Sequence, residues 1–354
     1  MLTKREKIFT LIGLVTLFAV LALLNYLLDD YYLRIINLIG INIILVASLN
    51  LTNGFTGIFS LGHAGFMAVG AYVSALLTIP EVQKAAALPD LPPWLMGISL
   101  PFPVALLAAG LIAALFALVI GFPVLRLRGH YLAVATLGFL VIVRVGLANA
   151  EAITRGARGI SGLPAFTNTW WVWGVAVLTI YLLWRLLHSS YGRGMIAIRD
   201  NEVAAAALGV NVTAHKMLAF ATGAFFAGVG GALWGHLFTV ISPNFFSYNQ
   251  TFLLVEMSVI GGMASLTGAV TGATLMTVLP EVLRLLEGGA VVFGYTLPPL
   301  YGLSQLILAS LVIVVIIFRP QGLIGRWEFS WKRILNSEKK GEVVVATTDS
   351  SGRD

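Results

Sequence analysis

Residues that could perform catalysis are sparse in this 354-residue chain. No cysteine is present, which excludes disulfides, iron–sulfur clusters and thiolate metal sites. The sequence contains no G-x-x-x-x-G-K-[ST] phosphate loop, no His/Glu metal constellation and no G-x-S-x-G elbow. We therefore expect no catalytic site, no metal and no cofactor. Any ATP hydrolysis linked to this chain must take place in another chain.

Two glycine-rich stretches are the first candidates for a functional role. Asn53–Phe66 carries four glycines between two apolar segments. Residues 259–268 show a similar pattern, with glycines on both sides of a Ser-Leu pair. Glycine permits bends and close approach of backbones, so the stretches either border a passage between helices or serve tight helix packing. The candidate residues are Ser60, Gly62, His63, Gly65, Gly261, Gly262 and Ser265.

A polar loop at about 189–213 is the second candidate. Ala204–Leu208 favours a short helix, and Gly209 suits its C-terminal cap. Glu202, Ala205 and Gly209 share one small-residue face, which offers a docking surface for a partner's groove. The alternative is an amphipathic helix that lies on a membrane surface. The candidate docking residues are Arg193, Arg199, Asp200, Glu202, Ala205 and Gly209.

The elements around these stretches are apolar and long. The chain is 58% hydrophobic and only 11% charged, against about 25% charged residues in soluble domains, which predicts a chain embedded in a lipid bilayer. A bilayer core needs roughly 20 apolar residues per helix. We expect an all-α membrane protein with about ten spans: 8–28, 33–51, 58–79, 97–125, 130–149, 170–187, 214–238, 250–265, 267–287 and 299–318.

The segment 250–287 is the least regular of these. Residues 250–265 are short for a span and end near Gly261-Gly262, so a broken or re-entrant helix is the alternative to two spans. The likeness between the two glycine-rich stretches also suggests an internal repeat.

Two charges, Arg144 and Glu256, fall inside expected spans. Charges in lipid are costly and usually paired, so they are candidates to pair with each other. Uncharged polar residues in spans more often hold helices together than bind a ligand. They are Asn37, Asn42, Asn50 and Gln305.

The basic residues predict the orientation. If both termini lie in the cytoplasm, sixteen lysines and arginines fall on the cytoplasmic side, five on the outer side and one within a span, which accounts for all 22. Cytoplasmic loops carry such an excess, so the net charge of +6 does not indicate nucleic acid. We expect a transmembrane domain over residues 1–327, a retained first helix rather than a cleaved signal, and a polar cytoplasmic tail over 328–354.

Five motifs in order make the sequence resemble the LivM-type permeases of branched-chain amino acid ABC importers from about Asn37 to Arg326. They are Ser60-Leu61-Gly62-His63 with Phe66 and Gly70-Ala71-Tyr72; Arg126-Leu127-Arg128-Gly129 with Tyr131-Leu132-Ala133 and Thr136-Leu137; Thr154, Gly156, Gly159 and Gly162-Leu163; Gly192-Arg193 with Ala197–Glu202 and Ala204-Ala205; and Phe318–Leu323. Ala264 and Ala269 depart from the pattern, which leads one to expect glycine and proline there.

The resemblance implies a type II importer-like permease of the inner membrane. Its implied partners are a LivH-type permease, two cytoplasmic ABC ATPases and an extracytoplasmic substrate-binding protein. The loop at 189–213 would couple the chain to the ATPases, and the chain itself would be no enzyme. Two other functions stay open: an ion-coupled secondary transporter of small polar solutes, and an ABC permease for urea or short amides.

Overall fold

The computed structural model describes residues 4–127, 129–287, 291–292, 295–296, 302–325 and 327–328. Contacts divide the chain into two units, residues 1–33 with 327–354, and residues 34–326. Helix α1 (Lys4–Leu27) and the start of α2 are the described helical parts of the first unit. Arg128, Arg326 and the tail from residue 329 lie outside the described residues.

Seven of the described helices are long and apolar enough to cross a membrane. Besides α1 they are α2 (Asp30–Asn50), continued by a π-helix at Leu51–Phe55, α6 (Phe102–Val124), α7 (His130–Asn149), α9 (Thr169–Leu187), α12 (Val212–Phe238) and α14 (Leu266–Glu287). These helices confirm the expectation of an all-α membrane protein, but not the expected number of spans.

Three further expected spans are shorter helices. They are α3 (His63–Thr78), α13 (Tyr248–Gly261) and α15 (Leu303–Phe318), with 16, 14 and 16 residues. At 1.5 Å per residue, 16 residues extend about 24 Å, less than a bilayer core of about 30 Å. Helix α3 is followed after a bend of 119° by α4 (Glu81–Ala87). Ten spans and an internal repeat therefore stay predictions.

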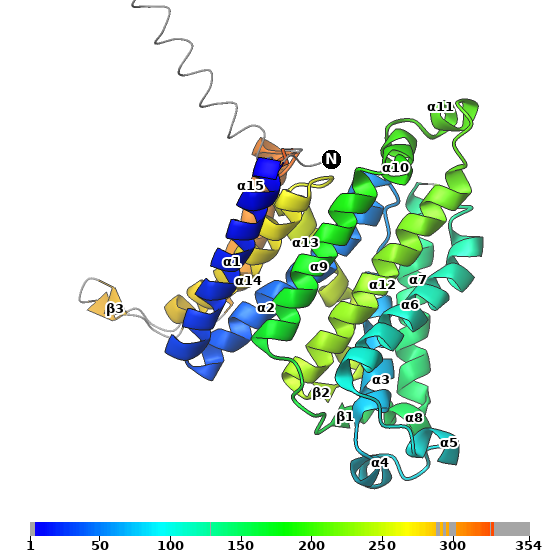
Figure 1. Ribbon diagram of the computed structural model, residues 1–354, viewed down its shortest axis with the longest axis vertical. Helices are drawn as coiled ribbons and strands as arrows, with labels where there is room; N and C mark the ends of the chain where they lie inside the picture. Colours follow the sequence, from blue (N-terminus) through cyan, green and yellow to red (C-terminus); the bar gives the residue numbers. More distant parts are fainter. Residues whose placement is uncertain are drawn as a thin grey trace, which may run out of the picture. The chain divides into compact units, whose positions relative to one another are not determined.

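The loops of the second unit gather at opposite ends of its helices (Figure 1). One end carries α10 (Ser190–Asp200) and α11 (Glu202–Ala207). The other end carries α4, α5 (Pro93–Met96), α8 (Glu151–Thr154), 3-10 turns at Gly156–Arg158 and Pro243–Phe245, and the strands β1 (Ile160–Ser161) and β2 (Val240–Ile241). The two strands pair antiparallel, as do β3 (Val291–Val292) and β4 (Tyr295–Thr296).

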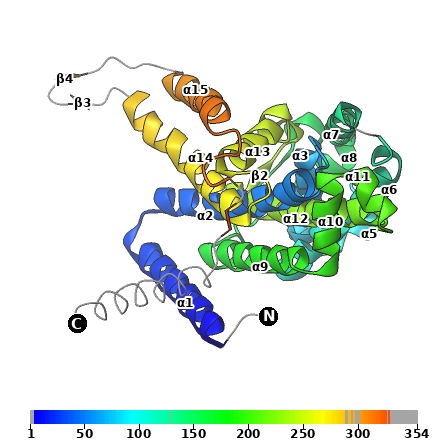
Figure 2. The same cartoon turned by 90° about the horizontal axis from the view of Figure 1, so that it is seen from above.

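Helices α3, α6 and α12 pack tightly on one another, and Figure 2 shows the bundle from above. A methyl group on Gly70 of α3 would lie 2.1 Å from the carbonyl oxygen of Gly228 of α12. One on Gly231 would lie 2.0 Å from the carbonyl oxygen of Met67. Because lipid offers little hydrophobic drive for helix association, such close backbone contact supplies the van der Waals packing that holds membrane helices together.

Buried polar side chains fix the β1–β2 end. His236 Nδ1 donates to the carbonyl oxygen of Pro164 over 2.8 Å, and its Nε2 lies 3.0 Å from Ser74 Oγ. The fully buried Lys84 ammonium donates to the carbonyl oxygens of Leu95 and Ile98. Neither residue was singled out as a structural anchor by the sequence, although their types are those that need partners when buried.

A carboxylate joins α14 to α15. Glu287 Oε1 accepts hydrogen bonds from the Ser304 hydroxyl at 2.6 Å and from the Ser304 backbone N–H at 2.7 Å. The bond to the backbone satisfies one of the free N–H groups at the start of α15.

Candidate functional site

The end of α2 and the turn that follows form a junction between distant segments. We call residues Ser48–Gly57 the α2 junction. The side chain of Asn50 in this junction is fully buried. Its Nδ2 donates to the carbonyl oxygens of Ser265 at 2.9 Å and Gly262 at 3.3 Å, and its Oδ1 accepts from the Ala264 N–H at 2.8 Å. One side chain thus satisfies three backbone groups of the turn between α13 and α14.

That turn joins two antiparallel, closely packed helices rather than interrupting one. A methyl group on Gly261 would lie 1.9 Å from the carbonyl oxygen of Gly268, so α13 and α14 touch through backbone. Gly262 has φ +126° and Ala264 has φ +64°. The left-handed conformation of Ala264 costs roughly 1–2 kcal/mol for a residue with a Cβ, and the Asn50 bond to its N–H helps to hold it.

The motif after α15 packs on the same turn. The N–H groups of Leu323 and Ile324 donate to the carbonyl oxygens of Ile260 and Gly261, over 2.8 and 3.2 Å. Carbonyls in the last turn of a helix lack partners within the helix, so this segment caps α13. Gly322, with φ +83°, lies against Gly262 so closely that a Cβ would come within 2.6 Å of its Cα.

The first glycine-rich stretch contacts the other side of the α2 junction. Asn53 Nδ2 donates to the carbonyl oxygen of Ser60, and its Oδ1 accepts from the Ser60 N–H, at 3.1 and 3.0 Å. His63 Nε2 lies 2.9 Å from Ser48 Oγ. Gly62 and Gly65 lie against α7, where a Cβ on either would come within 3.0 Å of Thr136 or Phe139.

The seven residues proposed for a passage therefore fall into two buried groups on either side of the α2 junction. The groups are Ser60, Gly62, His63 and Gly65 between α2, α3 and α7, and Gly261, Gly262 and Ser265 between α13, α14 and Asn50. Their geometry is that of close helix packing within the chain. The sequence separated the two stretches by about 200 residues, and the structure brings both to α2.

The polar loop at 189–213 is built from two capped helices. Asn201 Oδ1 accepts from the N–H groups of Val203 and Ala204, both at 3.0 Å, and begins α11. Gly209 has φ +84°, and the Gly209 and Val210 N–H groups donate to the Ala206 and Ala205 carbonyls. This is a Schellman cap, so the predicted short helix with Gly209 at its end is confirmed.

The three residues of the predicted docking face on α11 differ in exposure. Ala205 is buried, and Glu202 forms an ion pair with Lys216 of α12 at 2.7 Å. Glu202 therefore contacts the chain's own α12 and Ala205 is covered, whereas Gly209 stays exposed. The side chains directed outward are apolar: Val203 is 73% exposed and Leu208 is 84% exposed.

Helix α10 reaches the α2 junction through Arg199. Its Nη1 donates to the carbonyl oxygen of Gly54 over 3.4 Å, while its Nη2 pairs with Asp200 Oδ1 at 2.9 Å. Gly57, with φ +74°, lies so close that a Cβ would come within 3.2 Å of the Arg199 Cα. Arg193 is exposed and donates to the His188 carbonyl. The α2 junction thus connects the polar loop to both glycine-rich stretches.

The two charges in expected spans do not pair with each other. The Arg144 guanidinium lies over the ring of Tyr248, the first residue of α13, 5.4 Å from its centroid. Neither Arg144 nor Glu256 takes part in an ion pair within the described residues. Asn42 was expected to hold helices together, and its Nδ2 does so by donating to Thr277 Oγ1 at 2.8 Å, which links α2 to α14. No group of three His, Cys, Asp or Glu suited to a metal occurs in the described part of the chain.

Comparison with known proteins matches residues 31–318 to a family described as branched-chain amino acid transport system / permease component. The high-affinity branched-chain amino acid transport system permease protein LivM of Escherichia coli (strain K12) is 31% identical over 96% of this chain and 80% of its own length. LivM of Salmonella typhimurium (strain LT2) is 32% identical over 85% of this chain and 72% of its own length. LivH of the same strain is 25% identical over 78% of this chain and 88% of its own length. No solved structure shows significant similarity.

The Asn50 contacts predict a stability effect. Asn50→Ala removes the bonds from the Asn50 amide to the Ala264 N–H and the Gly262 carbonyl, and a buried polar group that loses its partner costs about 1–3 kcal/mol. The Ser265 carbonyl keeps its bond from the Ala269 N–H. We expect a clear fall in the thermal unfolding temperature of the purified protein in detergent. Asn149→Ala is the matched control, because its exposed amide bonds only the Val145 carbonyl of its own helix. Equal unfolding temperatures for the two variants would contradict the role given to Asn50.

Proposed function

Because the chain belongs to the family of branched-chain amino acid transport system permease components, we propose that it is the membrane-spanning subunit of an ATP-driven importer for branched-chain amino acids. The family match over residues 31–318 carries this proposal, since it covers six of the seven described helices that are long and apolar enough to cross a membrane. The proposed location is the inner membrane, with the ten apolar helices as spans.

The proposed partners follow from the same relatives. A LivH-type permease, to which the chain is also similar, would complete the passage. Two cytoplasmic ABC ATPases would supply the hydrolysis for which the sequence has no phosphate loop. An extracytoplasmic binding protein would deliver the amino acid and decide most of the specificity.

The coupling mechanism rests on contacts of the polar loop. The ATPases would bind the outward apolar side chains of α11, and their closure would move α10 and α11. Arg199 would transmit this movement to Gly54 of the α2 junction, which holds the α13–α14 turn through Asn50 and the first glycine-rich stretch through Asn53. Such a partner-biased change between two arrangements is the usual form of a conformational switch. In this proposal the glycine-rich stretches are the packed surfaces that rearrange.

The proposed orientation puts the α10–α11 end in the cytoplasm. Arg126, Arg193, Arg199 and Lys216 belong to that end, whereas Lys84, Arg155 and Arg158 belong to the β1–β2 end. Over the whole sequence this orientation places sixteen basic residues on the cytoplasmic side and five on the outer side, which supports a cytoplasmic assignment under the positive-inside rule.

Uptake by the reconstituted transporter tests the function. Vesicles containing the chain, its permease partner and the ATPases should accumulate leucine, isoleucine or valine only with ATP and the loaded binding protein. A protonophore should leave the initial rate unchanged. Uptake driven by an ion gradient without ATP would establish the secondary transporter instead. ATP-driven uptake of urea or acetamide without branched-chain amino acids would overturn the substrate.

Substitutions on α11 test the docking face. Val203→Arg and Leu208→Arg should each lower co-purification of the ATPases at least tenfold, because a central apolar contact is commonly worth about 2 kcal/mol or more. Val82→Arg is the control, since Val82 is 82% exposed on α4 at the opposite end. Wild-type ATPase recovery with both α11 variants would exclude this face.

Cysteine labelling tests the orientation, and the chain offers a background without cysteine. Val82→Cys and Ala165→Cys are exposed at the β1–β2 end and should react with an impermeant thiol reagent in intact cells. Ser190→Cys, exposed at the start of α10, should react only after the membrane is permeabilised. Labelling of Ser190→Cys in intact cells would invert the proposed topology.

A further inference from the structure

Glu256 is a carboxylate in the middle of an apolar helix. Helix α13 begins at Tyr248 and ends at Gly261. At 1.5 Å per residue, Glu256 therefore lies about 12 Å along the helix from one end and about 8 Å from the other. Long lysine and arginine side chains near a helix end can extend to the lipid headgroups. The shorter side chain of Glu256 stays at the depth of the helix in the proposed membrane arrangement.

Glu256 lies on the side of α13 that the rest of its unit leaves open. Phe252, Glu256 and Val259 recur at i, i+4 and i+7, which places them on one face of the helix. Phe252 is 47% exposed, and the other two are partly exposed. Leu254 and Met257, on the opposite side, are buried where the helix packs on its neighbours. We call Phe252, Glu256 and Val259 the open face of α13.

The described part of the chain supplies no cation to this carboxylate. Glu256 takes part in no ion pair there. The Arg144 guanidinium lies over the ring of Tyr248 instead, 5.4 Å from its centroid. Helix α1 cannot supply a cation from within its apolar stretch, because residues 8–27 contain no lysine or arginine.

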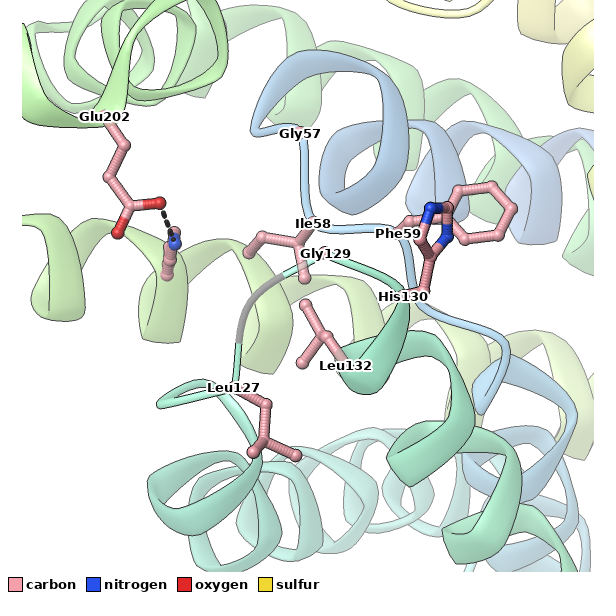
Figure 3. A pocket seen from close by; sticks show the side chains of 9 residues that line it. Gly57, Ile58, Phe59, Leu127, Gly129, His130, Leu132 and Glu202 are labelled. Carbon is pink, nitrogen blue, oxygen red and sulfur yellow. Dashed lines mark hydrogen bonds and ion pairs between the residues drawn. The ribbon is translucent and has the colours of Figure 1, made fainter.

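Other carboxylates of the bundle are compensated within the chain. Glu202 pairs with Lys216 at 2.7 Å beside a pocket at the α10–α11 end (Figure 3). Glu287 accepts two hydrogen bonds from Ser304. Glu256 has neither kind of partner within the described residues. Its compensation therefore has to come from another molecule.

We propose that the open face of α13 contacts a second membrane-spanning chain, which presents a cationic side chain to Glu256. A charge inside a bilayer is costly, and such charges are usually paired or face a water-filled cavity. Phe252 and Val259, about one turn before and after Glu256, are apolar and suit a packed helix contact better than water. The inference rests on the proposed function, in which a second permease completes the passage, and it names the helix where the two chains meet.

Symmetry disfavours a second copy of this chain as the partner. Two identical chains in one membrane are related by a two-fold axis along the membrane normal, so that each residue and its counterpart lie at the same depth. A contact centred on α13 would then bring two Glu256 carboxylates together, and each would disfavour the charged form of the other. A chain of different sequence with a basic residue at that depth removes this repulsion.

Nitroxide accessibility tests what covers the open face. Phe252→Cys and Val259→Cys provide single labelling sites, because the chain has no cysteine of its own. In bilayers, both labels should collide with oxygen several-fold less often in the complex with the LivH-type permease than in this chain alone. In the complex they should also be inaccessible to a water-soluble nickel chelate. Leu115→Cys, exposed in the middle of α6, is the control and should stay accessible to oxygen in both samples.

Three results would overturn the proposal. Equal oxygen access with and without the second permease would show that lipid covers the face. Access of the nickel chelate in the complex would show a water-filled passage there. Low oxygen access in this chain alone would show that a second copy, or the chain's own α1, covers the face.

Glu256→Lys tests the charge of the partner. Recovery of the LivH-type permease per inserted chain should fall at least tenfold, because like charges then face each other across the contact. Glu256→Gln, which keeps the shape without the charge, should lower recovery less. Leu115→Lys places the same ammonium group on an exposed position in the middle of α6 and should leave recovery unchanged. Wild-type recovery with Glu256→Lys would exclude a cation opposite Glu256.

The uptake assay separates this contact from the proposed function. ATP-driven uptake by a complex whose open face of α13 stays accessible to oxygen refutes only the contact. A shielded face in a complex that does not take up branched-chain amino acids refutes only the proposed function.

Discussion

The fully buried Asn50 side chain bonds three backbone groups of a turn more than 200 residues away in the chain. In an apolar surrounding, a backbone group without a partner costs far more than it does in water, so the geometry of this turn depends on one amide. This turn connects α13 to α14, which pack against each other in antiparallel fashion. It also contacts the segment after α15. Much of the arrangement near the α10–α11 end therefore depends on where α2 ends.

The π-helix at Leu51–Phe55 lies at the C-terminal end of α2, where neighbouring residues contact three different segments. Wider turns of this kind are rare and occur often at functional sites. Here the residues around it face in several directions: Asn50 toward α14, Asn53 toward the start of α3, and the Gly54 carbonyl toward Arg199 of α10. In the proposed coupling, a movement of α10 would act at the segment that contacts both glycine-rich stretches.

The opposite end is held by a different set of contacts. His236 ties α12 to α3 and to the loop before α9, and Lys84 closes the α4–α5 loop on its own carbonyls. Between the ends, α3, α6 and α12 touch through glycine and alanine. Packed interfaces have discrete arrangements rather than a continuous range of deformation, which is consistent with the proposed change between two arrangements.

Hydropathy, composition and glycine placement determined, without any structure, that the chain is an all-α membrane protein, where most helices lie, and that the polar loop holds a short helix capped at Gly209. These are local properties, since helix length and capping depend on neighbouring residues. The sequence also marked Asn50 as a polar residue that holds helices together, but it could not name the partner.

Only the tertiary structure decided which contacts form. The α2 junction joins segments far apart in sequence, and no local pattern specifies that pairing. The burial of α11 is a similar case, because alanines alone do not show which side of a helix is covered. In the structure Ala205 is buried and Glu202 pairs with Lys216 of α12. Likewise, the Arg144 guanidinium lies over the Tyr248 ring and forms no ion pair with Glu256 within the described residues, because helix packing sets which side chains come within reach.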